Sequence, residues 1–115
     1  MINLDYQSRT PIYEQIITEI ERYVSLGILK PKEQVMSIRE LATTLGINPN
    51  TVKKAYSELD KRGVIITIST KGTFISDNID GIIKQNVEEK IETIKNIISD
   101  LEKLGITKEE IIKKI

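Results

Sequence analysis

SIRELATTLGINPNTVKK, residues 37–54, has the pattern of two short helices joined by a glycine turn. Ser37 and Glu40 have the spacing of a capping box, in which each side chain accepts a hydrogen bond from the other residue's backbone N–H. Apolar residues follow at three- and four-residue steps, as on one face of a helix: Ile38, Leu41, Ala42 and Leu45. We expect this helix to end at Gly46, because glycine readily adopts the left-handed conformation of a helix C-terminus.

A second helix is predicted directly after the turn. Asn48 is a suitable N-cap, and Pro49 fits the first helical position, where a missing N–H costs little. The residues expected to face inward are Val52, Ala55, Tyr56 and Leu59, and those expected on the exposed N-terminal turns are Asn50, Thr51, Lys53 and Lys54. Such side chains can reach phosphates and base edges when the helix end enters the major groove of DNA. The segment therefore indicates a DNA-binding helix-turn-helix, the alternative being an ordinary helical hairpin with a solvated cationic face.

The sequence after the second helix changes to the pattern of a β-hairpin. Residues 61–63, Lys-Arg-Gly, are typical of a helix C-terminus, with cations near the negative end of the helix dipole. Residues 64–68 and 73–75 are rich in β-branched side chains, and residues 69–72 have turn composition. A helix-turn-helix followed by a hairpin is a winged helix. Lys71 and Gly72 lie at the expected tip of the wing, where a cation and close backbone approach both favour contact with DNA.

Several motifs together resemble the winged-helix domain of GntR-family bacterial transcription regulators, over about residues 13–75. The family's Ser-x-Arg-x-Leu-Ala pattern is matched at residues 37–42, its Thr-Val pair before a cation and Ala at residues 51–55, and most of its Gly-x-Gly-Thr-Phe wing at residues 71–74. The runs NPNTVKKAY (48–56) and RTPIYEQI (9–16) resemble the YtrA-type branch in particular.

The resemblance implies an α+β fold, a winged helix-turn-helix followed by a C-terminal helical hairpin, and a set of DNA-contacting residues. That set is Ser37, Arg39, Asn50, Thr51, Lys53, Lys54, Lys71, Gly72 and Thr73. Two departures matter. Pro49 stands where many members carry an arginine that reads guanine, so base readout is expected from Asn50, Thr51 and Lys53. Thr70 replaces the first glycine of the usual wing, which puts a wing contact in the minor groove in doubt.

Composition excludes several other classes of function. The chain has no cysteine or histidine, so disulfides, thiol nucleophiles and imidazole ligands are absent, and we expect no enzyme, cofactor or metal site. It has no long apolar run or leader-like segment, from which we expect a cytoplasmic protein without a membrane partner. The formal net charge is zero, but residues 37–72 contain six cations and three acids, a net charge of +3. This distribution suits double-stranded DNA as a partner.

The remaining third of the chain predicts a dimerisation helix. Apolar residues spaced by four, four, three, four and three positions form a seam like that of a coiled coil: Ile83, Val87, Ile91, Ile94, Ile98 and Leu101. The long helix is expected from Ile79 to Leu104 and to end at Gly105, and Thr107 with Glu110 predicts a second capping box. We expect a DNA-binding domain over residues 1–77 and a homodimerisation region over residues 78–115. Alternatively, the tail folds back on its own winged helix.

These features predict a sequence-specific transcription regulator, a repressor that binds a palindromic operator as a homodimer. The resemblance also implies control of a nearby operon, commonly one for a transporter. The tail is too short to form a separate ligand-binding domain, so an unknown small-molecule effector, if there is one, would act at an interface. The competing function is a winged helix used for protein contact without DNA readout.

Overall fold

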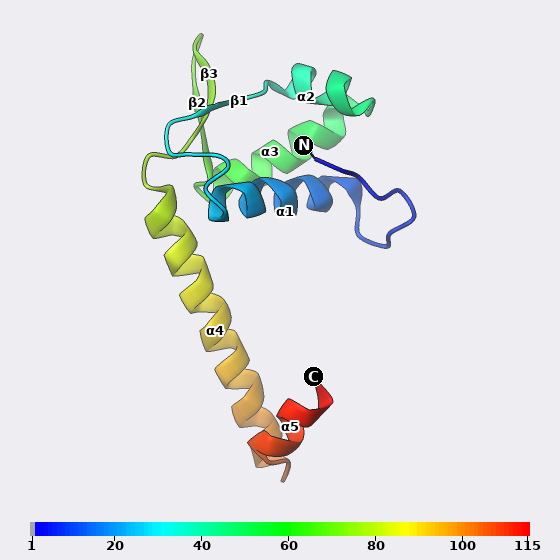
Figure 1. Ribbon diagram of the computed structural model, residues 1–115, viewed down its shortest axis with the longest axis vertical. Coiled ribbons are helices and arrows are strands. Elements are labelled where there is room, and N and C mark those ends of the chain that lie inside the picture. The colour runs from blue at the N-terminus through cyan, green and yellow to red at the C-terminus, as the bar shows by residue number, and fades with distance from the viewer. Residues whose placement is uncertain (1) are drawn as a thin grey trace. The chain divides into compact units, whose positions relative to one another are not determined.

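The computed structural model describes residues 2–115, which form five helices and a three-stranded antiparallel sheet (Figure 1). The elements are α1 (Ile12–Ser25), β1 (Gln34–Val35), α2 (Ile38–Leu45), α3 (Pro49–Lys61), β2 (Ile65–Ile68), β3 (Gly72–Ile75), α4 (Ile79–Lys103) and α5 (Lys108–Lys114). The chain divides into two compact units, Met1–Ile82 and Ile83–Ile115. This division lies within α4, beyond the boundary at residue 77 that the polar break suggests.

The first unit is a winged helix, which confirms the predicted α+β fold. Helices α1 and α2 both pack on α3. The core lies among the three helices and the base of the hairpin. Its most buried side chains are Ile16, Ile17, Ile20, Val24, Leu41, Ala42, Val52, Ala55, Tyr56, Leu59, Val64, Ile65, Ile75 and Ile79. Because Ile79 is only 1% exposed, the first turn of α4 belongs to this core.

The sheet contains one strand that the sequence pattern does not reveal. Its order is β1-β3-β2, so β3 is central and pairs antiparallel with both neighbours. In the hairpin Ile65 lies opposite Ile75 and Thr67 opposite Thr73, while on the other side Gln34 pairs with Phe74. Strand β1 has two residues, too few to show a period of two, and only pairing with β3 makes it a strand.

The second unit contains most of α4 and the short helix α5, which turns back after α4 (Figure 1). Gly105 makes the turn with φ +88°. Thr107 and Glu110 form the predicted capping box, in which the Glu110 N–H donates to the Thr107 hydroxyl at 3.2 Å. Ile111 is the buried side chain of α5. Among residues 2–115, no helix has the length and apolar character that a bilayer crossing requires.

Candidate nucleic-acid interface

A capping box fixes the start of α2, as the sequence predicts. The Glu40 N–H donates to the Ser37 hydroxyl at 3.1 Å, and the Ser37 N–H donates to a Glu40 carboxylate oxygen at 3.3 Å. Both side chains therefore satisfy backbone N–H groups at the N-terminus of α2. Arg39 lies between them and is exposed, so its guanidinium is accessible to a ligand at the N-terminal turn of α2.

The turn between α2 and α3 places the N-terminus of α3 at the surface. Gly46 has φ +67°, and the Ile47 N–H donates back to the Ala42 carbonyl at 3.0 Å. Asn48 then caps α3, since its side-chain oxygen accepts from the Asn50 N–H at 2.8 Å. The side chain of Asn50 is exposed on the first turn of α3, and that of Thr51 is half-buried.

An open groove brings together residues from four separate elements. It is lined by Ser37, Ile38, Arg39, Lys53, Tyr56, Ser57, Asp60, Ile65, Thr67 and Thr73. Arg39 comes from α2, Lys53 from α3, and the two threonines from opposite strands of the wing. Two cations and several hydroxyl groups thus face one concave surface, the combination of donors that binds a phosphate backbone.

Lys54 has a different environment from Lys53, although both are exposed. Its ammonium lies 4.0 Å from the centre of the Tyr13 ring, in a cation–π contact with α1. A second groove, between α1 and α3, is lined by Tyr13, Lys54 and also Lys53. The structure therefore places Lys53 beside both grooves and Lys54 only beside the second.

The wing projects a cation at its tip. Lys71 is exposed, and its N–H donates to the Ile68 carbonyl at 3.0 Å across the turn. Gly72 has φ +118°, so here a glycine is required by the backbone. Thr70, at the position of the usual first wing glycine, also has a positive φ of +64°. That angle explains why glycine suits this position, and threonine adopts it only with strain.

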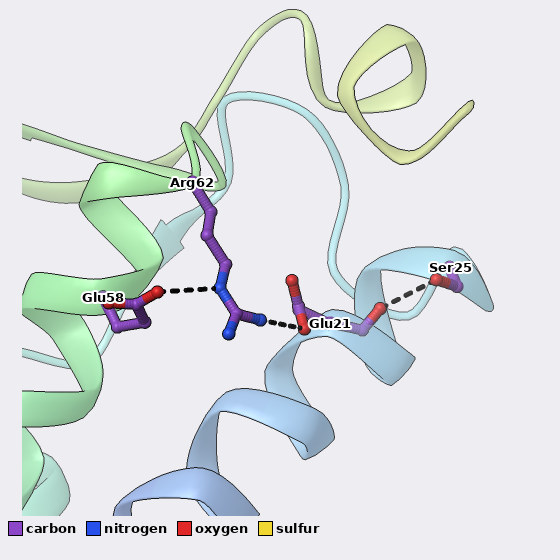
Figure 2. A network of polar contacts seen from close by, with 4 residues as sticks. All are labelled: Glu21, Ser25, Glu58 and Arg62. Carbon is purple, nitrogen blue, oxygen red and sulfur yellow. Dashed lines mark hydrogen bonds and ion pairs between the residues drawn. The ribbon is translucent and has the colours of Figure 1, made fainter. Parts of the chain in front are cut away.

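A polar network holds the C-terminal end of α3 to α1 (Figure 2). The Arg62 guanidinium lies 3.0 Å from a Glu21 oxygen and 3.2 Å from a Glu58 oxygen. Burial alone lowers the pKa of Arg62, but the two carboxylates raise it overall. Ser25 adds a hydrogen bond from its hydroxyl to the Glu21 backbone carbonyl. The sequence identifies residues 61–63 as a helix end but gives no sign of these partners.

Tyr56 ties α3 to the segment that precedes α2. Its hydroxyl donates to the Met36 carbonyl at 2.6 Å, and its side chain is almost fully buried. Burial raises the pKa of Tyr56 to about 12, with a smaller contribution from the charge of Glu40. The phenol is therefore harder to ionise than an exposed tyrosine, and its hydroxyl donates to the residue just before the N-cap of α2.

The apolar seam of α4 lies largely at the surface of a single chain. Val87, Ile91 and Ile94 are 51%, 47% and 55% exposed. Ile83, Ile98 and Leu101 are half-buried, while Ile97 and Leu104 add further exposed apolar surface. Monomeric proteins rarely expose a continuous apolar surface of this kind.

Comparison with known proteins shows the family to which this sequence is similar. Residues 12–75 match the family described as "Bacterial regulatory proteins, gntR family". The HTH-type transcriptional repressor YtrA of Bacillus subtilis (strain 168) is 42% identical over 112 residues, which cover 96% of this chain and 86% of that protein. This relative is a transcription regulator and not an enzyme.

Solved structures agree with the sequence match. A transcriptional antiterminator from Listeria monocytogenes EGD-e is similar with a TM-score of 0.73 and 44% identity, covering 98% of this chain and 85% of that one. The DNA-binding domain of AraR in complex with operator ORE1 is similar with a TM-score of 0.56 and 25% identity, covering 66% of this chain and 93% of that one. The chain described here belongs to the GntR family of bacterial regulatory proteins.

Proposed function

We propose that this protein is a homodimeric transcriptional repressor that binds a palindromic operator in double-stranded DNA. The observation that carries the proposal is the groove shared by Arg39, Lys53 and the wing residues Thr67 and Thr73. Four elements contribute donors to one open surface beside α3, an arrangement suited to contact with a phosphate backbone. The similarity to an operator-bound domain supports the same assignment.

The proposed contacts divide into base readout and backbone positioning. Asn50 and Thr51, on the first turn of α3, are assigned to base edges in the major groove. Lys53 is assigned to bases or the adjoining phosphates. Five residues are assigned to the DNA backbone: Ser37, Arg39, Lys71, Gly72 and Thr73. Lys54 stands apart from the rest of the predicted set, because its contact with Tyr13 favours a role in holding α3 on α1.

A second copy of the chain is the proposed partner of the α4 seam. The seam comprises Ile83, Val87, Ile91, Ile94, Ile98 and Leu101, three of them well exposed in one chain. Pairing two such helices would bury this surface and relate two winged helices by a two-fold axis. We propose that residues 1–77 supply DNA binding and residues 78–115 dimerisation, and that the operator has matching symmetry.

Repression is proposed because the B. subtilis relative is a repressor. Resemblance to the same branch suggests a transporter operon as the target and a cytoplasmic location, where bacterial DNA lies. A small-molecule effector, if one acts, would bind at the dimer interface.

Salt dependence separates DNA binding from the alternative of a protein-interaction module. Fluorescence anisotropy with a mixed-sequence duplex, repeated over a range of salt concentrations, gives the slope of log affinity against log salt. We expect Lys53→Ala to weaken binding and to reduce the slope by about 0.9 for each phosphate that the lysine neutralises. Lys103→Ala removes the same charge from the last turn of α4 and should leave the slope unchanged. Absence of DNA binding at low salt would favour the interaction module.

A further inference from the structure

Gln34 links the edge strand of the sheet to the tip of the wing. Its backbone pairs with Phe74 in the ladder between β1 and β3. Its side-chain amide Nε2 donates a hydrogen bond to the backbone carbonyl of Lys71 at 3.1 Å. The amide therefore holds the backbone of the wing turn at Lys71, the residue whose side-chain ammonium is proposed to contact DNA.

The turn held in this way has an unfavourable backbone. Thr70 is β-branched and has φ +64°, a left-handed conformation that is unfavourable for a residue with a Cβ. The Lys71 N–H to Ile68 carbonyl bond closes the turn from inside the hairpin. A strained turn persists only where its surroundings determine it, so a further bond from outside the hairpin has a clear structural role.

Gly72 leaves the space that the Gln34 amide occupies. A Cβ built on Gly72 would lie 2.6 Å from Gln34 Nε2, closer than real Cβ contacts allow. Glycine thus suits this position for two reasons. It adopts φ +118° easily, and its missing Cβ leaves room for the Gln34 amide beside the wing tip. The short Cβ distance and the hydrogen bond both follow from the placement of the Gln34 amide, while the positive φ of Gly72 is a separate property of the backbone.

We propose that Gln34 is a positioning residue for DNA binding. It fixes the backbone of the wing tip in the free protein, so that Lys71 is already ordered when it contacts the phosphate backbone. The inference rests on the proposed function, because it assumes that the wing contacts DNA. A tip that is already ordered loses less conformational freedom on binding, and preorganisation of this kind increases affinity.

A double-mutant cycle in DNA binding tests the proposal. Gln34→Met keeps a side chain of similar length without the donor, and we expect about threefold to tenfold weaker binding, with the fold intact by circular dichroism. Lys71→Ala should also weaken binding and flatten the salt dependence. Because Gln34 acts through Lys71, the double variant should bind as Lys71→Ala does. Gln85→Met removes another exposed glutamine hydrogen bond, to Glu89 in α4, and should leave affinity unchanged.

Backbone NMR relaxation on the free protein separates failure of this inference from failure of the proposed function. Gln34→Met should lower the order parameters of Lys71 and Gly72 from about 0.85 towards 0.6, and Gln85→Met should not. Unchanged order parameters, or affinity losses that multiply in the double variant, would overturn the positioning role while leaving DNA binding intact. If Lys71→Ala alters neither affinity nor slope, the wing contact of the proposed function is wrong, and the positioning role is wrong with it.

Discussion

Lys53 and Lys54 are adjacent in sequence, yet only Lys54 has its ammonium over an aromatic ring, that of Tyr13. We predict that Lys54→Met lowers the free energy of unfolding but leaves the salt slope of DNA binding unchanged. A double-mutant cycle with Tyr13→Leu, measured by urea unfolding at fixed protein concentration, should give a coupling energy of about 0.5–1 kcal/mol.

Lys53→Met is the matched control for this cycle. Its effect on the free energy of unfolding should show no coupling to that of Tyr13→Leu. It should nevertheless reduce the salt slope of DNA binding. A slope reduced by Lys54→Met as much as by Lys53→Met would mean that Lys54 leaves Tyr13 and binds phosphate in the complex.

Tyr56 gives the fold a dependence on alkaline pH. Its pKa is about 12 in the folded chain and about 10 when unfolded, so between these values the unfolded state loses the proton first. The stabilisation that the protonated hydroxyl gives the folded state is complete below pH 10. As pH rises from about 10 through the folded pKa, the free energy of unfolding falls by about 1.4 kcal/mol per pH unit.

We therefore predict that Tyr56→Phe is less stable than the wild type by about 1–2 kcal/mol at pH 8, because the Met36 carbonyl loses its donor. Above pH 10 the difference should shrink steadily. Urea unfolding of both proteins from pH 8 to 11.5 checks this, and a constant difference would show that the hydroxyl is not buried in the folded chain.

At the level of elements, the turn of the wing is the strained part of the fold. Thr70→Gly should raise the free energy of unfolding by up to about 1 kcal/mol, because glycine adopts φ +64° without a Cβ clash. Thr67→Gly, on the neighbouring strand, is the matched control and should destabilise the sheet. Thermal unfolding at one protein concentration compares the two. Equal destabilisation by both changes would contradict the assigned turn conformation.

Elements specified by local signals could be predicted from the sequence. The capping boxes at Ser37 and Thr107 and the turns at Gly46 and Gly105 all involve residues within a few positions of one another. The structure confirms both helices of the motif and the hairpin on this basis. Boundaries differ by a residue or so, as at the start of β2, because ladder pairing decides where a strand begins.

Features that depend on distant residues could not be predicted in this way. Strand β1 exists only through its pairing with β3, and Gln34 meets Lys71 across 37 positions of sequence. The contact between Tyr13 and Lys54 likewise requires α1 to pack on α3. The residue types expected to bind DNA were thus accessible from the sequence, whereas the side chains that orient them were not.

For the molecule as a whole, the proposed function depends on assembly through α4. Ile94→Glu places a charge in the seam and should dissociate the dimer, which sedimentation equilibrium or light scattering would detect as a monomer mass. Ile28→Glu changes an equally exposed isoleucine outside the tail and should leave the mass unchanged. A wild-type monomer at micromolar concentration would favour the alternative in which the tail covers its own winged helix.

The proposed function requires that two copies of this chain read a symmetric DNA sequence through α3 and the wing. Selection of bound sequences from random duplex DNA is the decisive experiment, with the wild type compared with Lys53→Ala. We predict that the wild type enriches a palindrome with two half-sites and that Lys53→Ala recovers it weakly or not at all. Enrichment of no sequence by the wild type at low salt, or of a single asymmetric site, would contradict symmetric DNA readout by a dimer.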